Sequence, residues 1–425
     1  MSPLSVLPSL GSQGVAKAAA RKEAVLFQGF GWESHKHEEG WWRHVKARVP
    51  DLKKAGCTHL WLPPPSQSVS PQVPAPPRLA AMQAGPAAAR AQQQQQPGRP
   101  HPTGYMPGQL YNLDASKYGN KDDLRGERID WGSWAITSND PTFRGSGNAD
   151  TGADYAAAPD LDHANPALRK ALTEWLAWLQ DHVGFGGWRL DFVKGYGAEF
   201  VDEYISKTVG RDALNVGEYW VDMSWNGSEL AVNQDGARQA LCNWIDANKM
   251  SSAAFDFPTK GILQEAVGKT QYWRLRDGQG KAPGLLGWWP EQAVTFTDNH
   301  DTGSSQQHWP FPGHLMGAGY AHVLTHPGMP CVFWEHYFDW GHELRETIDK
   351  LVQLRKRNNV LSDSKLEIKA AHHDLYFAVV DARVAVKLGP RMELGPLQPS
   401  KDQGWVVAAS GKDFCVWEKS AGGRE

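Results

Sequence analysis

The segment "GWRLDFVKG" (187–195) has the apolar residues of a buried β-strand but also contains two charged side chains. Arg189 and Asp191 are two positions apart, so in a strand both side chains lie on the same face. A buried charge is unfavourable unless a partner of opposite sign neutralises it, and these two residues can neutralise each other. The segment therefore predicts a strand that ends at a chemically active site.

Six further short runs of β-branched and aromatic residues resemble this strand and alternate with helical stretches. The helical stretches include 166–183 and 342–358. This alternation predicts an α/β protein with a parallel, TIM-type barrel. The seven candidate strands are 24–30, 59–64, 187–192, 213–220, 253–258, 293–300 and 330–336.

Beyond about residue 362 the pattern changes to strands alone, at the spacing of hairpins. The runs are "LEIKAA" (366–371), "LYFAVV" (375–380), "VAVKLG" (384–389), "WVVAAS" (405–410) and "FCVWEK" (414–419). We therefore expect a catalytic barrel over 24–361, followed by a small antiparallel β domain over 362–425.

Charged residues gather where the predicted parallel strands end, which is where barrel enzymes build their active sites. Asp191, Glu218 and the pair His300 and Asp301 each follow a different strand. One aspartate at a strand end is ordinarily a cap or turn residue, but three carboxylates at equivalent ends favour catalysis. Two carboxylates about 5 Å apart would suit a retaining glycosidase.

Composition narrows the class of partner. The 425 residues carry a formal net charge of -3, which gives no attraction to nucleic acid, and no apolar run is long enough to cross a membrane. The four cysteines lie far apart, which argues against a zinc or redox site. The 20 tryptophans offer flat faces that can stack on sugar rings, with core packing as the alternative for most of them. We expect a monomer.

The first 23 residues are rich in Ser and Ala, and they carry basic residues but no acid before Glu23. Plastid and mitochondrial transit peptides share this composition, and we expect a plastid location. A disordered terminus on a cytoplasmic protein is the alternative.

Three segments, in the order "GWRLDFVKG", "VGEYW" (216–220) and "FTDNHD" (296–301), resemble the conserved segments of the alpha-amylases of glycoside hydrolase family 13, in their plant and algal branch. The resemblance extends over most of 24–419 and includes "GYMPG" (104–108) and "GWWP" (287–290). It implies endo-acting hydrolysis of α-1,4 bonds in starch and related glucans, with retention at the anomeric carbon.

The resemblance also assigns roles to single residues. Asp191 matches the nucleophile, Glu218 the general acid/base and Asp301 the third carboxylate. The implied substrate contacts are Arg189, His300, Tyr105, Met106, Trp32, Lys194 and Trp220, with Trp288 and Trp289 as a surface site for starch granules. For Trp32 and Met106, core packing is the alternative interpretation.

The stretch 148–163 is dense in carboxylates, which repel one another unless water or a cation neutralises them. By resemblance, Asp150, Asp160 and the carbonyls of Ala153 and Gly195 would hold a central Ca²⁺ ion. A second Ca²⁺ would use Asp140 and Asp154. Composition alone leaves a solvated acidic loop as the alternative.

The chain departs from the family after "SKYGNKDDL" (116–124), where it passes directly to "RGERIDWG" (125–132). The family's third barrel strand and its Asn-His pair have no counterpart, which predicts a barrel lacking one strand and a shortened loop domain over 125–165. Residues 69–102, rich in Pro, Ala and Gln, are expected to form a disordered insertion. The missing strand suggests a second function: a catalytically impaired protein that still binds starch.

Overall fold

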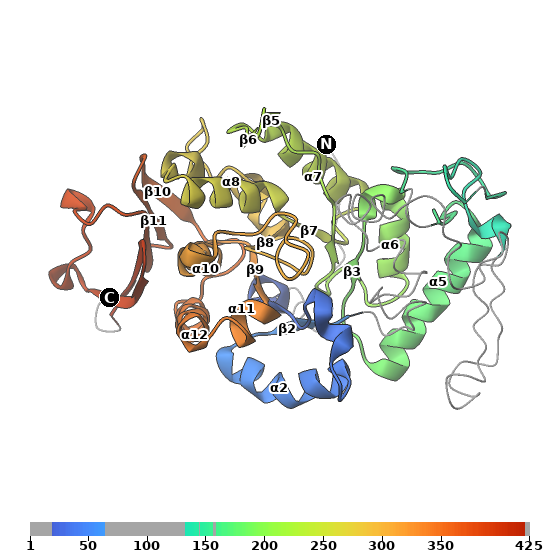
Figure 1. Ribbon diagram of the computed structural model, residues 1–425, viewed down its shortest axis with the longest axis horizontal. Helices are drawn as coiled ribbons and strands as arrows, with labels where there is room; N and C mark the ends of the chain where they lie inside the picture. The colour runs from blue at the N-terminus through green and yellow to red at the C-terminus, as the bar shows by residue number, and fades with distance from the viewer. Residues whose placement is uncertain (1–18, 64–131, 144, 156–158, 421–425) are drawn as a thin grey trace, which may run out of the picture.

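Seven parallel strands form a near-closed barrel in the computed structural model, which describes residues 19–63, 132–143, 145–155 and 159–420 (Figure 1). The strand order around the sheet is β2-β1-β9-β8-β7-β4-β3. Each strand falls in one of the seven predicted runs, apart from β9, which begins one residue before its run, so the predicted α/β barrel is confirmed. The strands are β1 (Leu26–Gln28), β2 (His59–Trp61), β3 (Arg189–Leu190), β4 (Val216–Gly217), β7 (Ala253–Phe255), β8 (Ala293–Phe296) and β9 (Met329–Phe333).

The first strand, β1, lies between β2 and β9 and pairs in parallel with both. Leu26 is in register with His59 on one side and with Cys331 on the other. Phe27 is fully buried, and burying such a side chain contributes about 1.5–3 kcal/mol. The start of the chain is therefore joined to a strand formed about 300 residues later.

The two ends of the sheet are β2 and β3, which do not pair with each other. Within the described part of the chain, no strand occupies the place between them. This agrees with the predicted absence of one barrel strand. The predicted insertion 69–102 lies outside the described residues.

Helices pack around the barrel and include both of the predicted helical stretches (Figure 1). Asn165 caps the helix that begins at Pro166, because its side chain accepts a hydrogen bond from the Ala167 N–H. This helix passes into a π-helical turn over Leu179–Val183 and ends at Gly184, whose φ of 92° is left-handed. The main helices are α2 (Trp41–Ala55), α5 (Pro166–Trp178), α6 (Ala198–Ser206), α7 (Asp235–Ala247), α8 (Phe257–Gly268), α10 (Met316–Thr325) and α12 (His342–Arg357).

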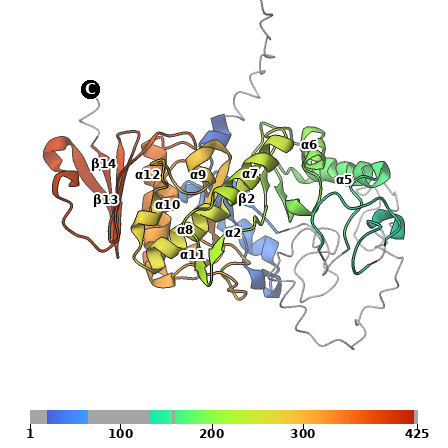
Figure 2. The same ribbon diagram turned by 90° about the horizontal axis from the view of Figure 1, so that it is seen from above.

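A five-stranded antiparallel sheet stands at one end of the molecule, beside α10 and α12 (Figure 2). Its strand order is β10-β11-β12-β14-β13, and all five predicted C-terminal strands are present. Val384 and Val386 on the central strand are fully buried and belong to the same apolar core as α10 and α12. The strands are β10 (Leu366–Ala371), β11 (Tyr376–Val380), β12 (Val384–Leu388), β13 (Trp405–Gly411) and β14 (Phe414–Lys419).

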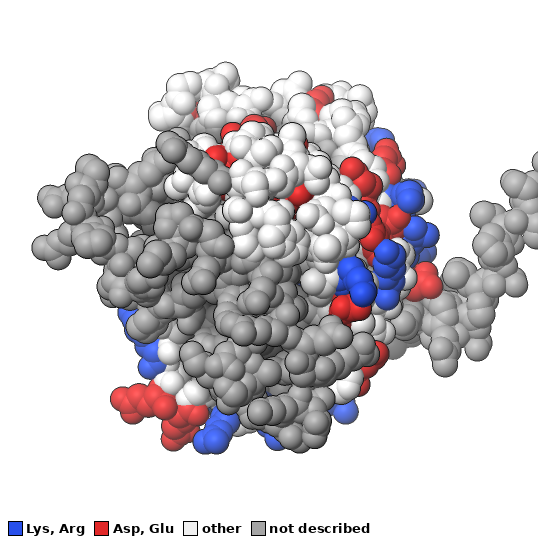
Figure 3. All heavy atoms as spheres, turned by 90° about the vertical axis from the view of Figure 1, so that its right-hand side faces the viewer, with Lys and Arg blue, Asp and Glu red and all other residues white. Residues whose placement is uncertain are grey.

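The surface of the described residues carries charges of both signs. In the face shown in Figure 3, acidic and basic side chains lie beside one another along one margin. None of the helices described is both long and apolar enough to span a bilayer.

Candidate active site

The carboxyl ends of β3 and β4 place two carboxylates next to each other. Asp191 follows β3 directly, and Glu218 follows β4 directly. The Glu218 N–H donates to the Leu190 carbonyl at 2.8 Å, and the Glu218 carbonyl accepts from the Val193 N–H at 3.3 Å. The parallel pairing of these short strands therefore continues past their ends and sets the spacing of the two acids.

Arg189 binds both carboxylates. One terminal nitrogen of its guanidinium forms an ion pair with Asp191, and the other forms an ion pair with Glu218. The exposed fractions of the three side chains are 6%, 3% and 0%, so the ion pairs are shielded from solvent. The structure thus places Arg189 and Asp191 on one face, as predicted, and adds Glu218 to the pair.

Several oxygens of the three carboxylates lack hydrogen-bond partners. Asp191 Oδ2, Glu218 Oε2 and both carboxylate oxygens of Asp301 are buried and accept no hydrogen bond from the described residues. Buried acceptors are ordinarily satisfied, and exceptions gather at functional sites. A polyhydroxylated ligand carries the donors that these oxygens lack.

Burial dominates the protonation of this group. It raises the pKa of Asp191 well above the ordinary value, with Arg189 opposing the shift and Glu218 adding to it. Burial also raises the pKa of Asp301, with Glu218 adding to the shift and Arg189 opposing it. One guanidinium therefore does not offset the desolvation of Asp191 and Asp301, whose pKa values both rise. Arg189 favours the charged form of Asp191, but it acts against a larger effect of burial.

A turn built by Asn299 holds Asp301 in place. The Asn299 side-chain oxygen accepts from the N–H groups of Asp301 at 3.0 Å and Thr302 at 2.9 Å. The Thr302 hydroxyl accepts from the Asn299 N–H at 3.0 Å and donates to Asp298 at 2.9 Å. The loop after β8 is therefore rigid where it presents the third carboxylate.

Three aromatic rings surround His300. The ring centroids of Phe30 and Trp61 lie 5.0 and 5.5 Å from the imidazole, and Trp32 stacks on it at 6.1 Å. Burial lowers the pKa of His300 well below the ordinary value, and Arg189 lowers it further. His300 is therefore neutral at physiological pH, and its Nε2 lies 3.6 Å from Asp301 Oδ2.

Backbone strain occurs next to Asp191. Phe192 has φ 40° and ψ 46°, a left-handed conformation that is unfavourable for a bulky residue. Such strain costs on the order of 1–3 kcal/mol and is found preferentially at functional sites. The Phe192 ring is buried against Tyr155, with ring centroids 5.1 Å apart, and this packing holds the strained conformation.

The remaining predicted substrate contacts lie in different surroundings. The Lys194 ammonium is 3.5 Å from Asp222 Oδ1, and the Trp220 ring packs on Phe257 at 4.3 Å. Trp32 begins a 3-10 helix, and its N–H donates to the Ser304 hydroxyl at 3.1 Å. Tyr105 and Met106 lie outside the described residues.

Trp288 and Trp289 precede β8 and so lie toward the amino end of the barrel, opposite the carboxylates. Both indoles are partly buried. The guanidinium carbon of Arg238 lies 4.1 Å from the centroid of the Trp288 ring, and the Arg238 side chain is 1% exposed. Trp288 therefore covers a buried cation in addition to facing solvent.

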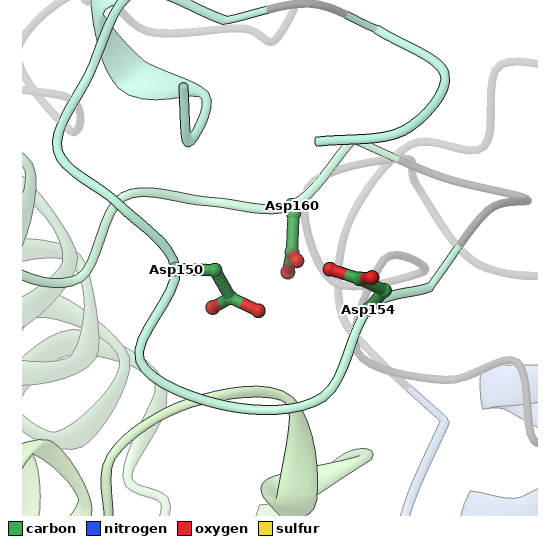
Figure 4. Close-up of side chains that lie close together, drawn as sticks. All are labelled: Asp150, Asp154 and Asp160. Atoms are coloured by element: carbon green, nitrogen blue, oxygen red, sulfur yellow. The ribbon is translucent and has the colours of Figure 1, made fainter. Parts of the chain in front are cut away.

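Asp150, Asp154 and Asp160 converge in the acidic loop, with one carboxylate oxygen from each within 4.8 Å of the others (Figure 4). Burial raises the pKa of Asp160 to about 8, and the negative charge of Asp150 adds to the shift. Asp150 Oδ2 and Asp160 Oδ2 are buried and have no hydrogen-bond partner among the described residues.

The acidic loop lies against the segment that follows Asp191. The Ala153 N–H donates to the Lys194 carbonyl at 2.8 Å, and a Cβ on Gly152 would lie 2.3 Å from the Gly195 carbonyl carbon. The Asp140 carboxylate instead accepts from the N–H groups of Thr142, Phe143 and Asp160. Asp154 is therefore grouped with Asp150 and Asp160, while a second site using Asp140 stays a prediction.

Some residues around the carboxylates were not among the predicted site residues. Gln28, Trp61 and Asn299 contact His300, Arg189 or the Asp301 loop, and Tyr155 packs on Phe192. Gln28 could have been recognised from the sequence, because it is a polar residue in the apolar run "AVLFQGF" (24–30). Arg189 is a charged residue in a similar apolar run.

Comparisons with known proteins identify relatives of this chain. Residues 357–418 match the family model of the alpha-amylase C-terminal beta-sheet domain. The Arabidopsis thaliana protein "Probable alpha-amylase 2" is 42% identical over 93% of this chain and 94% of its own length. The Arabidopsis thaliana protein "Alpha-amylase 3, chloroplastic" is 37% identical over 98% of this chain and 48% of its own length. The Hordeum vulgare alpha-amylase type B isozyme is 54% identical over 37% of this chain and 99% of its own length.

Solved structures share the fold. An Anoxybacillus alpha-amylase has a TM-score of 0.58 at 15% identity, covering 95% of this chain and 99% of its own. An alpha-amylase from Geobacillus thermoleovorans, solved in complex with acarbose, has a TM-score of 0.56 at 13% identity, covering 94% and 98%.

Proposed function

The chain belongs to the plant branch of the alpha-amylases of glycoside hydrolase family 13, and on that premise we propose that Asp191, Glu218 and Asp301 catalyse its hydrolysis of α-1,4-glucan bonds. The observation that carries this assignment is the single guanidinium of Arg189, which binds Asp191 and Glu218 together while other oxygens of the three acids lack partners.

In the proposed mechanism, Asp191 attacks the anomeric carbon while Glu218 donates a proton to the oxygen of the leaving glucan. The C–O bond to the leaving sugar breaks as the ester to Asp191 forms. Glu218 then takes a proton from water, which cleaves the ester and restores the anomeric configuration. Asp301 and His300 bind hydroxyl groups of the sugar at the cleaved bond.

The charges around Arg189 bear on the roles of the two acids. Three buried carboxylates face one guanidinium, and burial raises the pKa of two of them, Asp191 and Asp301. The mechanism requires a proton on Glu218 and a charge on Asp191, and Arg189 stabilises that charge. Sugar hydroxyls that donate to the unpaired oxygens would stabilise it further.

Endo-acting cleavage of starch is tested by incubating the full chain with soluble starch. We expect reducing ends to appear with a rapid fall in iodine staining, because internal bonds are cut. The alternative, an impaired protein that only binds starch, predicts adsorption to starch granules without new reducing ends. The comparisons give this alternative no support.

We further propose that Asp150, Asp154 and Asp160 hold a Ca²⁺ ion. Calcium prefers oxygen ligands, and the two buried, unpartnered oxygens of Asp150 and Asp160 fit that preference. The carbonyls of Ala153 and Gly195 are the additional ligands expected from the sequence. A bound cation would neutralise the acidic loop and fasten it to the segment after Asp191.

Starch and shorter α-glucans are the proposed substrates, and a plastid is the proposed location. The chloroplastic relative supports this location, together with the composition of residues 1–23. Residues 24–361 are the proposed catalytic unit and 362–425 the β domain. The monomeric state and the absence of nucleic-acid and membrane partners stay predictions.

A further inference from the structure

Gln28 is the last residue of β1, and its side chain is fully buried beside His300. Its amide nitrogen lies 3.1 Å from two atoms, the Phe30 carbonyl oxygen and His300 Nδ1. No step of the proposed mechanism uses Gln28. A polar side chain buried this deeply against His300 therefore points to a separate role.

The Phe30 carbonyl determines how the Gln28 amide is oriented. A carbonyl oxygen only accepts hydrogen bonds, so the group facing it must be the NH2 and not the amide oxygen. That NH2 has a second hydrogen, which points to His300 Nδ1. Because an NH2 group only donates, Nδ1 must accept and cannot itself carry a proton.

We infer that Gln28 fixes His300 as the neutral tautomer that carries its proton on Nε2, which makes Gln28 a positioning residue for hydrolysis. Nε2 is the nitrogen on the side of Asp301, at 3.6 Å, which is beyond the range of a direct hydrogen bond. The Nε2–H group is thus kept as a donor for a sugar hydroxyl bound near Asp301. Phe30, Trp61 and Trp32 enclose the ring and hold its orientation.

The opposite tautomer would be unfavourable here. A proton on Nδ1 would face the Gln28 NH2, and rotating the amide to relieve this would turn its oxygen toward the Phe30 carbonyl. Either arrangement leaves two like groups in contact in a buried site. The consequence for catalysis rests on the proposed role of His300, whereas the tautomer itself does not.

The test is ¹⁵N NMR of the imidazole nitrogens in the full chain, with the His300 signals assigned from their loss in His300→Gln. We expect the wild type at pH 7 to show a protonated Nε2 and an unprotonated Nδ1. Gln28→Met keeps the length of the side chain but removes the donor, and we expect a mixture of tautomers. Gln28→Glu places an acceptor at Nδ1, and we expect the proton to move there.

Starch hydrolysis provides the second readout. We expect kcat to fall about tenfold in Gln28→Met, with KM changed by less than about twofold, because one oriented hydrogen bond is lost. Gln292→Met is the matched control: Gln292 is also a buried glutamine, but it precedes β8 at the amino end of the barrel. It should leave both the tautomer and kcat unchanged.

A wild-type spectrum with the proton on Nδ1, or on both nitrogens, would overturn the inference even if the Gln28 variants failed to fold. An unchanged tautomer in Gln28→Met would overturn it as well. A changed tautomer with unchanged kcat would overturn the positioning role. A wild-type chain that binds starch without cleaving it counts against the proposed function, while the NMR result still decides the tautomer.

Discussion

Arg189 lies over the face of the Trp61 indole, with its guanidinium carbon 4.7 Å from the ring centroid. Trp61 is the last residue of β2, one edge of the open barrel, whereas Arg189 begins β3 at the other edge. A desolvated cation on an aromatic face gains about 2 kcal/mol. This contact therefore connects the two end strands of the described sheet through the cation that Asp191 and Glu218 share.

Arg189→Lys should lower kcat by at least tenfold while the chain stays folded. A compact ammonium keeps the charge, but it cannot bind Asp191 and Glu218 at the same time as a planar guanidinium does. Initial rates of reducing-sugar release and thermal melting followed by circular dichroism test this. Activity within twofold of the wild type would show that bridging the two acids is unimportant.

Asp191→Asn should abolish nearly all starch hydrolysis, because a neutral amide cannot form the glycosyl ester. Glu218→Gln should instead retain activity on aryl glucosides whose leaving group needs no proton. Both variants are nearly isosteric with the wild type and control for each other. If Asp191→Asn kept a tenth of the wild-type rate, its assignment as the nucleophile would be wrong.

Calcium should stabilise the chain more as the pH rises. Burial raises the pKa of Asp160 to about 8, so without metal this acid is protonated at neutral pH. Because its pKa is raised in the folded state, the free energy of unfolding decreases as the pH rises from about 4 to 8. Calcium requires the carboxylate form and reverses that loss. Melting temperatures with calcium and with chelator should diverge from pH 6 to pH 9. Asp160→Asn should abolish the divergence, and a calcium effect that weakened with rising pH would contradict the assignment.

Trp288→Ala together with Trp289→Ala should weaken adsorption to starch granules and leave hydrolysis of short soluble oligosaccharides nearly unchanged, because both indoles lie at the end of the barrel opposite the carboxylates. Trp288→Ala should also lower the melting temperature, since it uncovers Arg238. Trp42→Ala, at an indole that is 43% exposed, is a control. Equal losses on granules and oligosaccharides would mean that the pair is structural.

His326 should contribute stability that is lost in acid. It is fully buried, its Nε2 lies 2.8 Å from the Tyr376 hydroxyl, and burial lowers its pKa to about 3. A depressed pKa means that the contribution is complete above about pH 6.5 and declines as the pH falls toward 3. The stability advantage of the wild type over His326→Gln in urea unfolding should shrink by up to about 1.4 kcal/mol per pH unit below 6.5. A pH-independent difference would contradict this.

The barrel could be predicted because its strands are buried on both faces and read as short apolar runs. Even β3, with two residues in the ladder, could be recognised, since a charged pair inside an apolar segment is rare away from functional sites. The three carboxylates could be placed at strand ends by topology alone. Both long helices could also be predicted, because the residues that cap a helix and form its apolar face are near one another in the sequence.

Contacts between distant segments could not be predicted. The bond from Gln28 to His300 joins residues 272 positions apart, and neither neighbourhood specifies it. Tertiary packing holds Phe192 in a left-handed backbone conformation that this residue type disfavours on its own. The family resemblance suggested that Asp154 serves a second metal, whereas the fold of the loop brings it beside Asp150 and Asp160.

The pairing of Leu26 with Cys331 also means that β1 is synthesised long before its partner strand β9. A ribosome adds about 5–20 residues per second, so roughly 15 to 60 s pass between the emergence of these two residues. Throughout that interval β1 can pair only with β2, and its other edge stays open to wrong partners. Nascent chains therefore expose this edge of β1 until β9 leaves the exit tunnel, and translation that pauses before residue 329 lengthens the exposure.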